Sequence, residues 1–336
     1  MEKVTQFQEL WIWAEQRNGK LMRVSLELLS KGRELAEKLG VRLAAVLIGD
    51  QAEAMARELI SYGADKVHLV EDARLKLYQS DVYTNILEAL IHSYSPGILL
   101  LGGTTIGMDL APRVAARVQT GLTAHCVDLT IEAVNGQPKL IGTVPGWGGN
   151  MMVQISWKDR YPQMATVKPG VLDKPVQDEG RKGEIIKLQP HVKDEDFKAK
   201  TVDLVEEKIE GMPLEDADVV VAGGWGMNAA GGFKLIGELA GVLSASTAGT
   251  RPAIDAGWMP EEHMIGSSGK TISPKLFVSL GASGAMHFTT GFSKAKVVLA
   301  VDKNPQAPIF DVCDIGIVGD VGEIIPSLVK ELSTAK

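Results

Sequence analysis

The chain has 336 residues, 45% of them hydrophobic, and a formal net charge of −7 at pH 7. This length fits about two domains, each able to bury its own core. Acidic and basic residues are interspersed and aromatic residues make up 5%, which argues against nucleic-acid binding. The apolar runs are of strand length, and residues 1–10 lack the apolar core of a signal peptide. We therefore expect a cytoplasmic protein with no membrane span.

The first part of the chain alternates short apolar runs with amphipathic segments. This pattern predicts strands at 10–14, 41–48, 66–70 and 98–101, and helices at 25–39, 52–62, 81–94 and 109–119. We expect Asp81 to cap its helix and Pro112 to lie near the first turn of the fourth helix. Such alternation predicts a parallel sheet with helices on both faces.

A hairpin pattern follows. Asn135-Gly136 separates predicted strands at 127–134 and 139–144, and further β runs at 151–157 and 164–167 complete an expected antiparallel extension of the first sheet. The stretch 172–218 is rich in Lys, Glu, Asp and Pro, and within it we expect an exposed loop at 174–183 and a linker at 193–213. A domain boundary near 205–215 would divide the chain into domains of residues 1–210 and 211–336.

The second domain returns to α/β alternation. Strands are predicted at 219–222, 242–245, 276–280, 297–301 and 314–318, and helices at 233–240 and 324–332. Several of these strands end in glycine or small polar residues, where backbone N–H groups can approach a phosphate. Such turns at one edge of a parallel sheet predict a doubly wound dinucleotide-binding domain. The glycines at 223–226 do not match the GxGxxG fingerprint of NAD enzymes.

No catalytic constellation is visible in the sequence. Cys126 and Cys313 form no CxxC motif, and the six histidines form no ligand cluster, so we expect reduced thiols and no metal. A chain without a Ser-His-Asp set or paired carboxylates fits a protein whose cofactor carries the chemistry.

Longer motifs are more specific. The chain resembles the alpha subunit of electron-transfer flavoproteins along nearly its full length, and the motifs that carry this resemblance are spread over both predicted domains. They are residues 107–117, 120–124, 148–150, 160–170, 251–257, 269–270, 283–285, 307–310 and 316–320. The resemblance implies FAD in the second domain and a beta subunit that packs on the first. It further implies that the beta subunit holds AMP or, in electron-bifurcating members, a second FAD, and that an acyl-CoA dehydrogenase-type protein is the redox partner. The second domain is expected to swing about the linker near 205–215.

The resemblance also implies which residues contact the cofactor. The positions that keep the family pattern are Thr250 and Arg251 at the flavin and pyrophosphate, Ser283, Gly284, Ala285 and Met286 at the phosphates, and Asp320, followed by Val321, on the adenosine side. The positions that depart are Trp225 for arginine, Ser267-Ser268 for Gln-Thr, His287-Phe288 for Gln-His, and Asp302 for asparagine.

Each of these residues has a plainer interpretation. Arg251 could form a surface ion pair, the turn at 283–285 could be an ordinary strand–helix connection, and Asp320 could cap a turn. Trp225 either stacks on the flavin ring or is an exposed or interface tryptophan. His287 could be a structural histidine without contact to a cofactor.

The departures predict unusual redox properties. Trp225 in place of arginine removes a positive charge and Phe288 in place of histidine removes a donor, so we expect a flavin of lower potential, with His287 compensating in part. The alternative function is a nucleotide-binding regulatory or scaffold module that has lost flavin.

Overall fold

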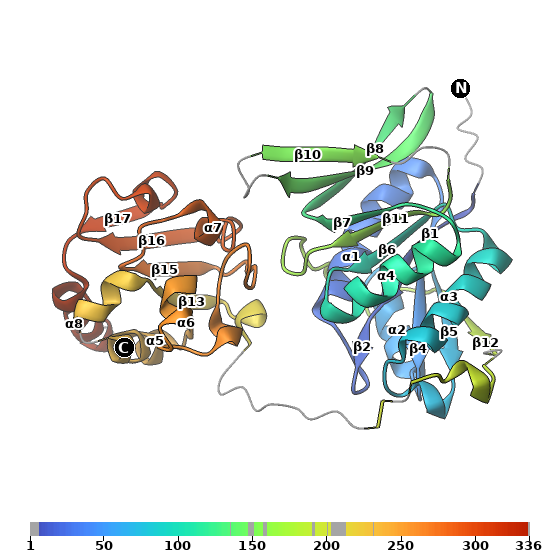
Figure 1. Ribbon diagram of the computed structural model, residues 1–336, viewed down its shortest axis with the longest axis horizontal. Helices are drawn as coiled ribbons and strands as arrows, with labels where there is room; N and C mark the ends of the chain where they lie inside the picture. The colour runs from blue at the N-terminus through green and yellow to red at the C-terminus, as the bar shows by residue number, and fades with distance from the viewer. Residues whose placement is uncertain are drawn as a thin grey trace. The chain divides into compact units, whose positions relative to one another are not determined.

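The computed structural model describes residues 7–134, 136–146, 151–156, 160–189, 192–199, 201–202, 213–230 and 232–334. The chain forms two compact units, Met1–Pro145 with Met152–Val205, and Gly146–Met151 with Glu206–Lys336 (Figure 1). Residues 200 and 203–212, about half of the predicted linker and most of the predicted hinge, lie outside the described residues. The domain limits at 210 and 211 therefore stay a prediction.

The first unit is built on a seven-stranded sheet of order β12-β5-β4-β1-β6-β11-β7, in which every neighbouring pair is parallel. The strands are β1 (Glu9–Ala14), β4 (Arg42–Gly49), β5 (Lys66–Glu71), β6 (Ile98–Gly102), β7 (Leu122–Cys126), β11 (Gln163–Val167) and β12 (Glu184–Leu188). All residues of β1, β6 and β11 are buried, as expected for the centre of a covered parallel sheet.

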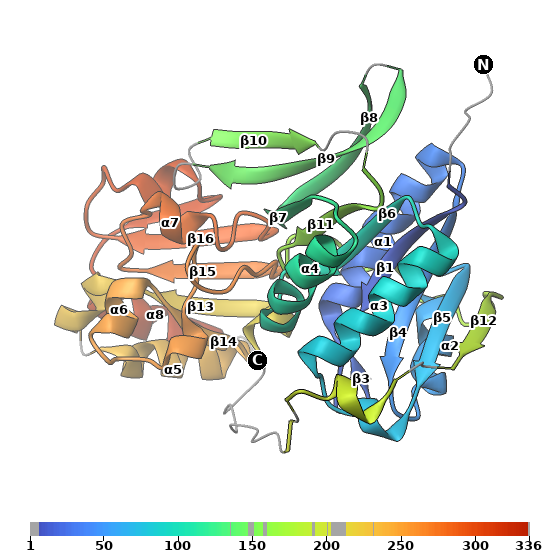
Figure 2. The ribbon, with the colours of Figure 1, turned by 45° about the vertical axis from the view of Figure 1, so that its right-hand side comes forward.

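Helices cover both faces of this sheet, as predicted. Helices α1 (Arg23–Leu39) and α2 (Glu53–Ser61) pack in one apolar core, while α3 (Ser80–Tyr94) and α4 (Thr105–Arg117) pack in the other. Figure 2 shows α3 and α4 side by side on their face of the sheet. Helix α1 ends at Gly40, which adopts φ 70°, the left-handed conformation that glycine accepts without strain.

Two predictions about how helices begin, the cap at Asp81 and the position of Pro112, are wrong. Helix α3 begins at Ser80, so Asp81 lies in its first turn and does not cap it. Helix α4 begins four residues earlier than predicted because Thr104 caps it, accepting a hydrogen bond at 3.0 Å from the Gly107 N–H. Pro112 consequently lies inside α4 rather than in its first turn.

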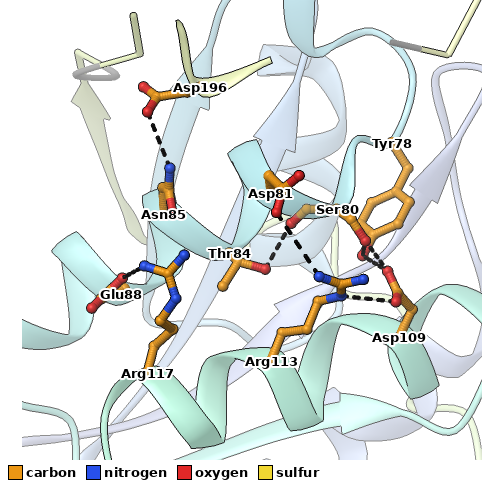
Figure 3. Close-up of polar contacts among 10 residues, drawn as sticks. All are labelled: Tyr78, Ser80, Asp81, Thr84, Asn85, Glu88, Asp109, Arg113, Arg117 and Asp196. Atoms are coloured by element: carbon orange, nitrogen blue, oxygen red, sulfur yellow. Dashed lines mark hydrogen bonds and ion pairs between the residues drawn. The ribbon is translucent and has the colours of Figure 1, made fainter. Parts of the chain in front are cut away.

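A polar network joins α3 to α4 (Figure 3). The Asp109 carboxylate accepts hydrogen bonds from the Tyr78 hydroxyl at 2.7 Å and from the Ser80 hydroxyl. It also accepts one at 2.9 Å from Nε of Arg113. Burial alone would raise the pKa of Asp109, but these hydrogen bonds hold it below its usual range. Asp109 and Arg113 belong to the 107–117 motif, so this part of the motif serves helix packing.

The antiparallel extension is smaller than predicted. Strands β8 (Asp128–Val134) and β9 (Gln137–Gly146) form the predicted antiparallel hairpin, with Gly136 at φ 77° and Asn135 outside the described residues, and β10 (Met151–Ser156) joins β9. The run at 164–167 instead forms β11, between β6 and β7 of the parallel sheet. A short apolar run fits either kind of sheet, so its pattern could not distinguish them. A small hairpin, β2 (Gln16–Arg17) with β3 (Lys20–Leu21), and strands β7 and β12 were not predicted.

The second unit holds a five-stranded parallel sheet of order β14-β13-β15-β16-β17. The strands are β13 (Val219–Gly223), β14 (Ser246–Gly249), β15 (Leu276–Leu280), β16 (Val297–Asp302) and β17 (Ile315–Val318). Helices α5 (Phe233–Leu243) and α8 (Val321–Thr334) pack on one face. The short helices α6 (Arg251–Asp255) and α7 (Met286–Thr289) follow β14 and β15. This α/β architecture with parallel sheets in both units confirms the predicted fold class.

One predicted strand of the second unit is wrong. Residues 242–245 end helix α5 and its cap, because Leu243 continues the apolar helical spacing of Leu235 and Leu239, and the strand begins at Ser246. The described 3₁₀ turns of the chain are Ala73–Leu75, Asp194–Asp196, Leu214–Asp216, Trp225–Ala230, Glu261–His263 and Pro308–Asp311.

Candidate functional site

A cavity of about 700 Å³ opens at the carboxyl ends of strands β13 to β16 in the second unit. The chain passes from β13 to β14 on one side and then to β15 on the other, so the cavity lies at the switch point where parallel sheets bind ligands. The residues that line it are Trp225, Gly226, Thr250, Arg251, Pro252, Ile265, Ser267, Ser268, Gly281, Ala282, Ser283, Gly284, Ala285, His287, Phe288 and Asp302.

Two glycine turns pack directly against each other at this edge of the sheet. The Gly224 N–H donates to the Leu280 carbonyl at 2.9 Å, and the Gly226 N–H donates to the Gly281 carbonyl at 2.9 Å. A Cβ on Gly224 would lie 2.4 Å from the Gly281 oxygen, which no side chain can accept. The turns after β13 and β15 are therefore held together backbone to backbone.

The turn after β15 is fixed a second time further along. Gly284 adopts φ 87°, and a Cβ there would lie 2.3 Å from the backbone nitrogen of Ile309. The Ile309 N–H in turn donates to the Ser283 carbonyl at 3.0 Å. This geometry leaves Ser283 and Ala285 exposed on either side of a buried glycine.

Thr250 and Arg251 lie at the end of β14, where α6 begins. Thr250 is 8% exposed, and its hydroxyl finds no hydrogen-bond partner among the described residues. The Arg251 side chain is 67% exposed, with Nε 3.5 Å from the exposed Asp255 carboxylate. An exposed ion pair of this length is weak, so the guanidinium can turn to another anion.

Ser267 and His287 are joined by two hydrogen bonds. The Ser267 hydroxyl lies 3.0 Å from Nδ1 of His287, and the Ser267 N–H donates to the His287 carbonyl at 2.7 Å. Gly266 adopts φ 138° beside the same carbonyl, where a Cβ would come within 2.5 Å of the oxygen. The chain at 266–268 is thereby attached to α7, and His287 has a fixed partner at one ring nitrogen.

The aromatic residues of the site differ in environment. Trp225 is 58% exposed and stacks on Trp258, with ring centroids 4.9 Å apart and an angle of 28°. Phe288 is 5% exposed, and its ring packs against Phe277 and Phe292. The ring of Phe288 thus belongs to the apolar core beneath the cavity, while Trp225 lies at the rim.

Most of the residues predicted to bind the cofactor converge on this cavity, but Met286, Asp320 and Val321 do not line it. The Asp320 carboxylate accepts from the Gly322 N–H at 2.7 Å and so caps α8, and Val321 is buried beside α5. Their contact with the cofactor stays a prediction. The Asp302 carboxylate accepts from the Asn304 N–H at 2.8 Å.

Sequence reasoning missed several residues of the site. Pro252 and Ile265 line the cavity, and Trp258 supports Trp225. Pro252 directly follows a predicted residue, whereas Ile265 and Trp258 lie in irregular segments where no pattern predicts a direction for the side chain. Gly226 and Gly281 also line the cavity, and their place in glycine-rich turns after predicted strands was a usable indication.

Other chemistry finds little support in the described part of the chain. No group of three or more His, Cys, Asp or Glu side chains there could hold a metal ion, and no described helix is long and apolar enough to cross a membrane. Cys126 is free and buried, and burial raises the pKa of its thiol to about 12. Cys313 is free and half-buried.

Comparison with known proteins agrees with the site. A family model described as electron transfer flavoprotein domain matches residues 10–193, and one described as electron transfer flavoprotein FAD-binding domain matches residues 213–293. The second match includes the cavity residues from Trp225 to Phe288. The chain therefore belongs to the electron-transfer flavoprotein family, as an alpha subunit with a role in electron transfer.

The relatives cover nearly the full length of the chain. The electron transfer flavoprotein subunit alpha of Thermoanaerobacterium thermosaccharolyticum is 43% identical, with 98% of this chain and 99% of that protein aligned. Protein FixB of Clostridium saccharobutylicum is 40% identical, over 99% of each chain. The acryloyl-CoA reductase electron transfer subunit beta of Anaerotignum propionicum is 35% identical, over 99% of this chain and 98% of that protein.

Proposed function

We propose that the cavity of the second unit binds FAD, and that the chain carries electrons to or from an acyl-CoA dehydrogenase-type partner. The observation that carries this proposal is the convergence of residues far apart in sequence. Residues from Trp225 to Asp302 that the family resemblance assigns to the cofactor come together at the switch point of the sheet. A volume of about 700 Å³ lies within the range of cofactor and ligand sites.

The side chains in the cavity fit the two ends of a flavin nucleotide. The Thr250 hydroxyl has no hydrogen-bond partner among the described residues, and a buried polar group without one costs free energy, so a ligand could supply the missing partner. Arg251 offers a planar, always-charged group for a pyrophosphate. Trp225 offers exposed apolar surface for a flat ring, and the nearly buried Ile265 and Ala282 add apolar atoms to the lining. When bound, FAD would supply the redox chemistry, while the chain binds, orients and shields it.

The same residues support a lowered flavin potential. Trp225 brings no positive charge to the cavity, and the Phe288 ring has no hydrogen-bond donor and is buried with other phenylalanines. Ser267 and His287 are donors that line the cavity, and Asp302 adds negative charge. With fewer cations near it, a negatively charged reduced ring is stabilised less, which lowers the potential.

The partners follow from the family and its relatives. We propose a beta subunit, with AMP or a second FAD, that packs on the first unit of a cytoplasmic heterodimer. We also propose work within a bifurcating or anaerobic reductase complex. The name of the Anaerotignum relative, an electron transfer subunit of an acryloyl-CoA reductase, supports an acyl-CoA substrate and a reductase as the redox partner. Both a simple carrier and an electron-bifurcating subunit fit this chain.

The flavin content of the co-purified heterodimer tests the proposal. A yellow protein with FAD is expected, with about one FAD per heterodimer for a simple carrier and about two for a bifurcating one. A colourless protein that retains only AMP would contradict FAD binding and support a regulatory or scaffold module. The Arg251→Ala variant, made alongside, assigns the FAD to this chain.

A further inference from the structure

Three aromatic rings form a row that begins with Trp225 at the rim of the cavity. Trp225 stacks on Trp258, and Trp258 packs against Phe233 with centroids 5.7 Å apart and an angle of 47°. These separations lie within the range of favourable aromatic pairs. The three residues come from different segments, namely the turn after β13, the chain after α6 and the first residue of α5. The row is therefore a product of the tertiary fold.

The backbone holds this row in place. Trp225 lies between Gly224 and Gly226, both hydrogen-bonded to the strand-end turn of β15. The Trp258 N–H donates to the Ala253 carbonyl of α6 at 3.1 Å. Phe233 packs on the end of β13, where a Cβ on Gly223 would lie 3.0 Å from its ring. Each member of the row is thus supported by the frame of the sheet.

The exposure of Trp225 indicates what the row of rings could bind. A tryptophan can bury about 150–250 Å² and is usually covered in a folded protein. Here the residue is 58% exposed although its backbone is fixed and its indole is stacked on a second indole. Because it also lines the cavity, its free surface is available to a ligand there.

We propose that Trp225 and Trp258 form an aromatic wall for the planar ring of the cofactor, with Trp258 as a positioning residue that holds Trp225 in its stacking orientation. This inference rests on the proposed FAD function and extends it to a residue outside the lining of the cavity. The face of an indole carries partial negative charge. The wall therefore favours the electron-poor oxidised flavin ring over a negatively charged reduced one.

The test compares Trp258→Leu with Trp258→Phe in the complete heterodimer. Phenylalanine retains a ring for Trp225 to stack on, and leucine does not. We expect FAD to bind roughly 2- to 12-fold more weakly in the leucine variant, the range of an aromatic pair, and close to wild type in the phenylalanine variant. Flavin fluorescence provides a second readout, because a stacked indole quenches it by electron donation. Emission per bound FAD should rise in Trp258→Leu and in Trp225→Leu.

The possible results separate this inference from the FAD assignment. If wild type binds FAD and both Trp258 variants match it in affinity and emission, the wall is refuted while the FAD site stands. If the wild-type protein binds no FAD, both the FAD assignment and the aromatic wall are refuted. Trp225→Leu alters an exposed side chain, so it tests the wall even if the Trp258 variants misfold. If that variant keeps wild-type affinity and quenching, the wall is refuted as well.

Discussion

Replacing Glu9 by glutamine should destabilise the first unit in a pH-dependent way. Glu9 begins β1, and its side chain is 11% exposed. Its carboxylate accepts hydrogen bonds from the Trp11 indole at 2.7 Å and from Lys66, and lies 2.9 Å from Nε2 of His68. Burial alone would raise the pKa of Glu9, but the contacts with His68, Lys66 and Trp11 lower it from 4.5 to about 2.

The size of the effect follows from this pKa shift. A group with a pKa depressed on folding stabilises the folded state above its unfolded pKa, and the contribution is lost as pH falls toward the folded pKa. A lowering from 4.5 to about 2 corresponds to roughly 3 kcal/mol at neutral pH. At pH 7, Glu9→Gln should therefore lower the free energy of unfolding by about this amount. The difference from wild type should shrink between pH 4.5 and pH 2, where the Glu9 carboxylate takes up a proton in the unfolded chain while it stays ionised in the folded one.

Urea titrations at pH 7, 4 and 3, followed by tryptophan fluorescence, measure this difference. Glu53→Gln is the matched control, because hydrogen bonds from Lys187 and Arg57 also lower the pKa of Glu53 to about 2, but on the exposed surface. Solvent screens such pairs, so we expect a much smaller change in stability. A Glu9→Gln effect that stays constant with pH, or equals that of Glu53→Gln, would refute the reasoning.

Four further changes test the cavity. Arg251→Ala should weaken FAD binding roughly 10- to 100-fold, the effect of losing a hydrogen bond from a charged group, whereas Arg251→Lys should retain part of the affinity. A full complement of FAD after gel filtration of the alanine variant would contradict the assignment. Gly284→Ala should cost about 1–3 kcal/mol and reduce FAD content, because φ is 87° and the added Cβ meets Ile309; an unchanged melting temperature would count against this. Trp225→Arg should raise the flavin potential in a redox titration, and an equal or lower potential would oppose the tuning argument. Thr250→Val should stabilise the FAD-free protein slightly and weaken FAD binding, since its hydroxyl lacks a partner within the described chain; unchanged affinity would show that no ligand uses it.

The sequence predicted the alternating elements well because their apolar residues follow the periods of helices and strands. It failed where two structures share one pattern. Residues 242–245 read as a strand but continue a helix, and 164–167 read as part of a hairpin sheet but lie within the parallel one. The start of α4 was predicted wrongly for a different reason. The position of Pro112 was used to place the first turn, whereas the helix begins after the capping residue Thr104.

The site could be predicted in outline for a topological reason. Parallel strands end at one edge of a sheet, so Thr250, Ser283 and Asp302, each just after or at the end of a strand, come together without further information. Ile265 and Trp258 could not be predicted, because only the folded path of irregular segments directs them. The resemblance identified Phe288, but its ring turns into the core, which sequence position alone does not reveal.

The contact between the two glycine turns has a consequence for how such a site can change. Because Gly224 and Gly281 meet without room for a Cβ, the frame of the cavity depends on two peptide segments that cannot be exchanged residue by residue. The side chains around them, such as Trp225, Ser267 and His287, project from this frame and do not build it. Single substitutions of these side chains can thus change the electrostatics of the cavity, while the backbone shape that admits the cofactor can change only if both glycine turns change together.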